Sequence, residues 1–238
     1  MHAIPGLASG RHVEITGSAE VRWFSPGSNT SVEEWFASRF PNAASETERC
    51  DDYWIIPEVD FAGIKLREVP RPSQDHAGAF NLEFKLREAD LGVRWINGDI
   101  AGRVELWRKW SAQVPRDAEE YKDAFAGGRG NWNRVRKRRK LQRFEWTQEQ
   151  LAPVTGSKRL AFGCAIEVTD LVPEHSVHAH AAWTSLAVEA FTSPGGPHES
   201  TILGRALDEF RDIPTSGNLR LEDSRGYPSW LRSLTHWA

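Results

Sequence analysis

The sequence predicts an α+β protein built on a closed antiparallel β-barrel with helices packed on the outside. Two observations predict this fold. Most segments alternate apolar and polar residues with a period of two, which is typical of strands. Helical patterns are few, and long crossovers between the strand segments are rare, so neighbouring strands should run antiparallel and the sheet should roll up or close.

The expected strands follow one another along most of the chain. The dipeptide Asn97-Gly98 stands between two of them and is a strong hairpin signal. The strand segments are residues 13–24, 51–56, 61–69, 80–88, 91–96, 102–110, 134–146, 159–171 and 181–192.

Helices are expected at four places. Ser31 is the expected cap of a helix over 31–40, and Gly127-Gly128 would end a short helix over 116–126. Apolar residues recur at helical spacing in 200–213, and 226–234 adds a last short helix. With no evident linker, we expect a single domain over residues 1–238, in which 199–238 is a helical part that packs on the barrel.

The polar faces of the strands carry charges of both signs. In 80–88, Glu83, Lys85 and Arg87 alternate with apolar residues. A solvated outer face is the common explanation for one such strand. Two features favour a lined interior instead: Arg is frequent on these faces, and Glu167 and Glu189 each stand alone among small side chains. We therefore expect a charged lumen and an apolar outer surface.

Composition limits the class of protein. The chain has 238 residues, a formal net charge of −3 and two cysteines, so an anion site must be a local cluster of bases and no disulfide framework is expected. It shows neither a charged leader before an apolar run nor an apolar stretch of about 20 residues. We expect a cytoplasmic protein without a membrane partner.

The order of these strands resembles the CYTH group of the triphosphate tunnel metalloenzymes. The matching stretches include SAEVR in the first strand, GIKLREV and NLEFKLRE in the middle, and CAIEVTDL and TSLAVEAF near the end. RVRKRRKLQRF resembles the family's middle basic strand, and SRGYPSWL resembles its tail. The resemblance covers roughly residues 13–235.

The resemblance implies a tunnel that binds, and hydrolyses, an inorganic or organic triphosphate with Mg²⁺ or Mn²⁺. It implies Glu20 and Glu189 as metal ligands, and Glu105 and Glu167 as catalytic groups that hold a second ion or orient water. Which of Arg136, Arg138 and Arg139 points inward stays open. The implied substrate-binding residues are Arg22, Lys65, Arg67, Lys85, Arg87, Arg103, Arg136, Arg138 and Arg225.

Two departures from the family pattern affect the metal side of the tunnel. Ser18 and Ala187 stand where the family often has carboxylates. Mg²⁺ accepts few protein carboxylates beside water and phosphate oxygens, so Glu20 and Glu189 could suffice. The alternative is a binder of triphosphate or polyphosphate whose metal site is degenerate.

Two other signals carry less weight. The basic run 127–143 beside Trp132 suggests an RNA-binding module, but the acidic balance elsewhere would repel a long phosphate backbone, and we do not expect nucleic acid as the partner. His175, His178 and His180 could suggest zinc, but the sequence identifies no further ligand.

Overall fold

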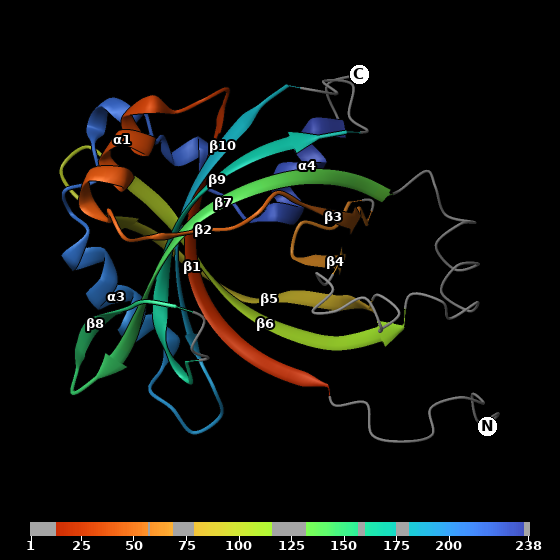
Figure 1. Ribbon diagram of the computed structural model, residues 1–238, viewed down its shortest axis with the longest axis horizontal. Coiled ribbons are helices and arrows are strands. Elements are labelled where there is room, and N and C mark those ends of the chain that lie inside the picture. Colours follow the sequence, from red (N-terminus) through yellow and green to blue (C-terminus); the bar gives the residue numbers. More distant parts are fainter. Residues whose placement is uncertain are drawn as a thin grey trace.

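Antiparallel strands dominate this computed structural model (Figure 1). It describes residues 13–56, 58–68, 79–115, 132–156, 160–174 and 181–235. The strands are β1 (Glu14–Pro26), β2 (Ala44–Ser45), β3 (Arg49–Trp54), β4 (Ala62–Glu68), β5 (Ala79–Trp95), β6 (Ala101–Pro115), β7 (Trp132–Thr147), β8 (Gln150–Val154), β9 (Phe162–Pro173) and β10 (Trp183–Thr192). The helices are α1 (Thr30–Arg39), α3 (Glu199–Glu209) and α4 (Tyr227–Thr235), with short 3₁₀ helices η2 (Thr215–Gly217) and η3 (Leu221–Asp223).

Strand pairing closes eight of the described strands into a barrel. β1 lies between β6 and β10; the sheet continues through β5, β4 and β3 on one side and through β9 on the other. β7 pairs with both β3 and β9, which joins the two ends. All these pairs are antiparallel, and β2 and β8 pair only with β7. The predicted fold class is confirmed.

The main apolar core lies outside the barrel, under α1 and α3. Val21 and Trp23 of β1 point into it together with Leu186 of β10, and Phe36 of α1 and Leu203 of α3 cover them; each of these side chains is at most 1% exposed. Burial of this many apolar groups is the main stabilising contribution of the fold. The helices do not cover the whole outer surface.

The outer surface of β5 is more open than that core. Phe84 packs against Trp110 of β6 with ring centroids 5.5 Å apart, yet Phe84 is 36% exposed. The expectation of helices over an apolar outer surface therefore holds for the side of β1, β9 and β10, where α1 and α3 lie.

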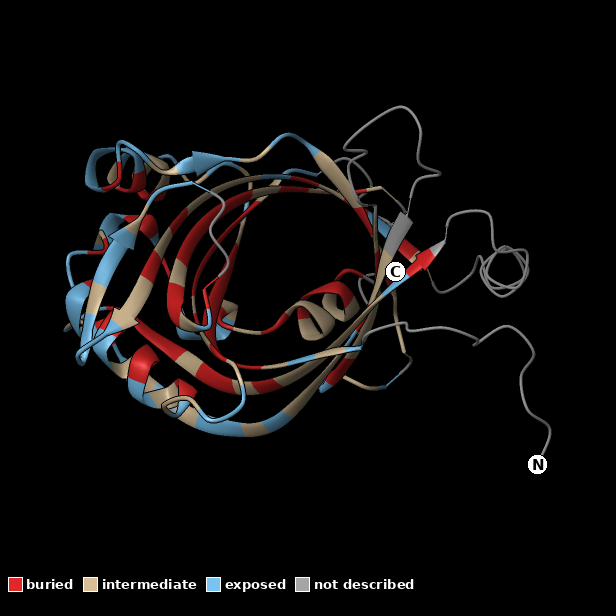
Figure 2. Ribbon diagram, turned by 60° about the horizontal axis from the view of Figure 1, so that its bottom comes forward, coloured by how far each residue is buried: buried red, intermediate tan, exposed pale blue. Residues whose placement is uncertain are grey.

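The last helix, α4, lies inside the end of the barrel, as Figure 2 shows. Its Trp230 stacks on Phe24, a residue on the inner face of β1, with centroids 4.6 Å apart, and Tyr227 stacks on Tyr53 of β3 at 5.4 Å. Leu171 of β9 belongs to the same buried cluster. The prediction that all helices pack outside is wrong for α4, because its apolar face fills the lumen.

Several local expectations are corrected. The two strands expected at 80–88 and 91–96 form one strand, β5, whose pairing with β6 shifts register near Gly92, at φ +85°. Asn29, not Ser31, caps α1: its side chain accepts a hydrogen bond from the Val32 amide. Asn97 accepts hydrogen bonds from Asp99 and Ile100 in the predicted hairpin turn.

Some expectations lie where the structure gives no description. The helix expected over 116–126 and the histidines at 175, 178 and 180 fall outside the described residues. Among the described helices, none is long and apolar enough to cross a membrane. The short strands β2 and β8 were not predicted, because two and five residues are too few for a periodic pattern.

Candidate functional site

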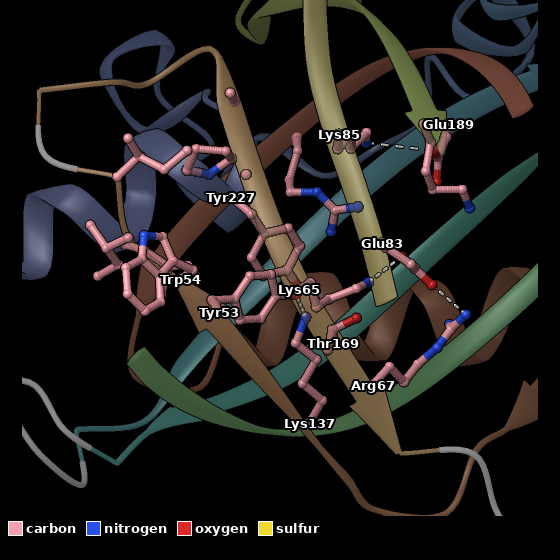
Figure 3. Close-up of a pocket in the computed structure, with 18 of the residues that line it drawn as sticks. Tyr53, Trp54, Lys65, Arg67, Glu83, Lys85, Lys137, Thr169, Glu189 and Tyr227 are labelled. Carbon is pink, nitrogen blue, oxygen red and sulfur yellow. Dashed lines mark hydrogen bonds and ion pairs between the residues drawn. The ribbon is translucent and has the colours of Figure 1, made fainter. Parts of the chain in front are cut away.

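The inner faces of the strands and one side of α4 enclose a cavity of about 160 Å³ (Figure 3). The alternation of side chains along each strand explains why charges gather there, since every second residue points inward. Among the described residues that line the cavity, eight are Lys or Arg and three are Glu. These bases are Arg22, Arg49, Lys65, Arg67, Lys85, Lys109, Lys137 and Arg139, and the acids are Glu83, Glu167 and Glu189.

Glu83 of β5 holds two bases of β4 in place. Its two carboxylate oxygens lie 2.8 Å from Lys65 Nζ and 2.6 Å from an Arg67 guanidinium nitrogen, and Figure 3 shows both contacts. Burial would raise the pKa of Glu83, but these two cations lower it to about 2. Burial lowers the pKa of Lys65 despite the acids beside it. The acid thus keeps a desolvated pair of bases charged and oriented toward the cavity.

Glu167 of β9 holds two arginines in place. One oxygen lies 2.6 Å from Arg22 of β1 and the other 2.9 Å from Arg139 of β7. Burial opposes the charge on Glu167, yet the two guanidinium groups lower its pKa well below the usual range. Arg139 also pairs with Glu46 at 2.5 Å. Glu167 is therefore suited to position arginines.

A second buried cluster joins β3 and β7. Lys137 is 4% exposed; its ammonium lies 3.2 Å from Asp51, donates a hydrogen bond to the Tyr53 hydroxyl, and sits 3.8 Å from the Tyr227 ring centroid. Burial is the main reason why the pKa of Lys137 falls to about 8. Lys137, with Lys65 and Arg49, keeps the pKa of the fully buried Asp51 low despite its burial. An anion in the cavity would favour the charged form of Lys137.

Two polar atoms of this lining have neither a hydrogen-bond partner nor an ion-pair partner in the described structure: Nε of Arg22 and Oγ1 of Thr169. Both residues are buried, at 5% and 1% exposure, and both line the cavity. Buried polar groups are nearly always hydrogen-bonded, because an unpartnered one costs about 1–3 kcal/mol. These two atoms indicate a place for oxygen atoms of a ligand or water.

Three carboxylates lie side by side on neighbouring strands. Glu20 of β1 is directly opposite Glu105 of β6 on one side and Glu189 of β10 on the other. Lys85 Nζ is 2.7 Å from Glu20 and 3.7 Å from Glu189. Arg87 donates to Glu105 at 2.6 Å. The two predicted metal ligands are therefore brought together, with one predicted phosphate ligand between them.

This row does not fit a divalent ion in the arrangement observed. Within the described residues, no group of three or more His, Cys, Asp or Glu side chains is arranged to hold a metal. Each carboxylate of the row already contacts a cation of the chain, either Lys85 or Arg87, and Ser18 on the same inner face supplies no charge. Mg²⁺ binds through carboxylate oxygens and water at about 2.0–2.1 Å, and an ammonium group at the same oxygens competes with it.

Five of the nine predicted phosphate-binding residues do not line the cavity. Arg136 and Arg138 lie on the outer face of β7, where Arg138 is paired with Asp170 at 2.8 Å. Arg103 is paired with Asp90 at 2.5 Å, toward the Asn97 turn. Arg225 borders a separate, largely apolar cavity of about 630 Å³. These placements are corrections to the expected set; Arg87, a fifth member, lies beside Glu105, outside the cavity lining.

The structure settles what the sequence left open on β7. Arg139, with Lys137, points inward, and Arg136 and Arg138 point outward. The run RVRKRRKLQR has bases in both phases, so alternation gave no signal for Lys137. Lys109 was detectable, because it shares the phase of Glu105 on β6. Arg49 lies before the segment expected as a strand and was missed for that reason.

The known proteins that this chain resembles are distant from it. No family model matches the chain, and no curated protein matches it. Among solved structures, it is similar to a conserved hypothetical protein from Pyrococcus furiosus (12% identity, 89% of this chain and 98% of that one, TM-score 0.41) and to a protein from Pyrococcus horikoshii (10%, 91% and 99%, 0.42). It is also similar to a chain of the Mediator head module of Schizosaccharomyces pombe (9%, 87% and 98%, 0.37). Likenesses this distant carry no argument about function.

Proposed function

We propose that the protein binds a triphosphate or a short polyphosphate in the charged lumen of its barrel. The observation that carries this proposal is the excess of bases on the cavity wall: eight Lys or Arg against three Glu among the described lining residues. Concentrated bases in a partly desolvated site bind multivalent anions, and Arg forms bidentate contacts with phosphate. The net charge of −3 makes this a local property of the lumen.

The hydrogen bonding and the charges of the lumen also favour an anion. Nε of Arg22 and Oγ1 of Thr169 lack partners, and burial lowers the pKa of Lys65 and of Lys137. Phosphate oxygens would supply the missing hydrogen bonds and favour the charged ammonium groups. Because Glu83 and Glu167 already hold four bases in position, little conformational entropy is lost when the anion binds.

The size of the cavity favours a compact ligand. Its volume of about 160 Å³ is below the roughly 300–1,000 Å³ typical of pockets for drug-sized molecules. We therefore expect inorganic triphosphate to bind more tightly than nucleoside or thiamine triphosphates.

Calorimetry with inorganic triphosphate tests the proposal, using two neighbouring arginines of β7 as a matched pair. Arg139→Ala removes an inward-facing base and should weaken binding by at least about tenfold, the equivalent of one charge-assisted contact. Arg138→Ala removes an outward-facing one and should leave binding unchanged. Equal losses in both variants, or no binding by the unaltered protein at low salt, would contradict the proposal.

Hydrolysis of the bound triphosphate is the second candidate function. It is favoured by the row formed by Glu105, Glu20 and Glu189, and by the burial of Glu105, which raises the pKa of its carboxyl group. Water would attack a terminal phosphorus, the bond to the bridging oxygen would break, and orthophosphate and pyrophosphate would form. The test is phosphate release from inorganic triphosphate with Mg²⁺ or Mn²⁺, compared with Glu20→Gln. No release under any of these conditions leaves binding as the function.

The structure adds little support for the RNA-binding hypothesis. The outward bases of β7 are paired with acids: Arg134 with Asp52 at 2.7 Å and Arg138 with Asp170 at 2.8 Å. Paired arginines attract a phosphate backbone less strongly than free ones. A gel shift that triphosphate does not compete away would favour this third function.

A further inference from the structure

The Lys85 ammonium lies at the row of three in-register carboxylates, Glu105, Glu20 and Glu189, where a cation would be expected to bind. Its ammonium is 2.7 Å from an oxygen of Glu20 and 3.7 Å from an oxygen of Glu189. The two acids come from adjacent strands and face each other directly in the β1–β10 pairing. One positive charge is therefore shared by two carboxylates, which is the arrangement that a bound metal ion would otherwise provide.

An aromatic ring also holds Lys85 at this point. The ammonium lies 5.0 Å from the ring centroid of Trp107, a fully buried residue on the inner face of β6. A cation over an indole face is attracted by the ring quadrupole. The ammonium thus interacts with the Trp107 ring and with both acids.

The third carboxylate of the row, Glu105, is paired with another cation and is not available as a further metal ligand. Glu105 accepts a hydrogen bond from Arg87 at 2.6 Å, and Arg87 also contacts Asp60 at 3.3 Å. Ser18 and Ala187, the inward-facing neighbours of Glu20 and Glu189 along their strands, contribute no charge. A divalent ion would have to displace Lys85 and shed its own water while gaining only two carboxylates.

We infer that the Lys85 ammonium is a built-in cation that takes the place of a divalent metal between Glu20 and Glu189. The lumen therefore binds its anion without a resident metal ion. The second statement rests on the proposed binding of triphosphate, whereas the first concerns the protein alone and is tested without any phosphate.

The chain offers a matched control for removing this charge. Lys109 of β6 is the direct cross-strand neighbour of Lys85 and lines the same cavity. Lys85→Ala and Lys109→Ala each remove one inward positive charge at the same level of the barrel. Only Lys85→Ala removes an ammonium that is in contact with Glu20 and Glu189.

The experiment is a titration with Mn²⁺ in phosphate-free buffer, with free Mn²⁺ followed by electron paramagnetic resonance. We expect weak binding to the unaltered protein, binding at least about tenfold tighter to Lys85→Ala, and a much smaller gain for Lys109→Ala. Adding Glu20→Gln to Lys85→Ala should abolish the gain. Lys85→Gln, which keeps more of the side-chain volume, replaces Lys85→Ala if circular dichroism shows that the latter does not fold.

Three outcomes would overturn the inference: tight stoichiometric Mn²⁺ binding to the unaltered protein, no gain in folded Lys85 variants, or an equal gain in Lys109→Ala. A second titration, of triphosphate in the presence of a chelator, tests the metal-free binding. If triphosphate binds only with Mn²⁺ present, Lys85 leaves the carboxylates when the anion enters, and the inference is wrong. If triphosphate binds under neither condition, the proposed function fails while the Mn²⁺ result stands by itself.

Discussion

The two faces of strand β1 are both buried, but they are buried by different means. On the outer face, Val21 and Trp23 pack under α1 and α3 among apolar side chains. On the inner face, Glu20 and Arg22 are nearly as inaccessible, at 2% and 5% exposure, and each contacts a group of opposite charge. A single strand thus separates an apolar core from a charged lumen.

The comparison shows that burial serves two purposes in this barrel. Apolar burial outside stabilises the fold and needs no further partner. Buried ion pairs inside stabilise little relative to an apolar interior, because desolvation offsets most of their attraction. The proposed binding of triphosphate would account for their presence, because the acids hold the bases in position for an anion. Changes in the outer core should therefore alter stability, and changes in the lumen should alter binding.

The largest effect should come from the outer core. Trp23→Ala removes a fully buried ring and the hydrogen bond that its indole donates to the Ala101 carbonyl, and should cost about 4 kcal/mol of unfolding free energy. Urea denaturation measures this loss. Trp95→Ala is the control, because Trp95 is 65% exposed and should change stability little. Triphosphate affinity of folded Trp23→Ala should be unchanged; a large change would erase the distinction between the two faces.

A change in the lumen should cause a smaller loss of unfolding free energy, and triphosphate should partly reverse this loss. Glu167→Ala leaves Arg22 without its 2.6 Å partner and should cost about 3 kcal/mol, since breaking a buried pair strands a charge. Added triphosphate should raise the melting temperature of Glu167→Ala by more than it raises that of the unaltered protein. Differential scanning fluorimetry with and without triphosphate measures both quantities. An equal gain in the two proteins would mean that the anion does not meet Arg22.

Acid should lower the free energy of unfolding through the ion pairs of the lumen, since the outer core is apolar. The pKa of Glu83 is lowered to about 2, chiefly by Lys65 and Arg67 acting against its burial. Because the folded pKa lies below the ordinary value near 4.5, this group stabilises the fold above pH 4.5, and the stabilisation is lost as the pH falls from there toward 2. Unfolding free energies between pH 6 and 2 should show that slope, and Glu83→Gln should flatten it. An unchanged slope in that variant would assign the acid sensitivity to other groups.

The smallest effect concerns binding at alkaline pH. The pKa of Lys137 is lowered by burial to about 8, so its ammonium is lost as the pH rises through 8. Triphosphate affinity should then fall by roughly tenfold between pH 7 and pH 9, the loss of one favourable charge contact. The free energy of unfolding should instead rise between pH 8 and 10.5, because the unfolded chain holds this proton more tightly than the folded protein does. Calorimetry on Lys137→Met should show weaker binding and a flatter pH profile; a profile as steep as before would exclude Lys137 as its source.

Much of the lumen could be predicted where a strand has one clear apolar phase. In β5, Leu82, Phe84 and Leu86 fix the phase, so Glu83 and Lys85 had to share the other face. β7 offers bases in both phases, and its two predicted arginines proved to face outward. Arg103 and Arg225 were assigned from the family resemblance, and both lie away from the cavity.

The position of α4 could not be predicted from its pattern. Its amphipathic sequence indicates a helix with one apolar face, but that face fits the outside of a barrel as well as its interior. The structure places Trp230 on Phe24 and Tyr227 on Tyr53, so the helix closes one end of the lumen. It thereby sets the volume available to a ligand.

The sequence by itself determined most of the strands and the alternation of charged and apolar faces, because these depend on residues two positions apart in one segment. Only the tertiary structure decided which charges meet. The contacts of Lys85 with Glu20 and Glu189, and of Glu167 with Arg22 and Arg139, join residues more than 20 positions apart. Such contacts depend on register and barrel closure, which are set by the packing of the whole chain.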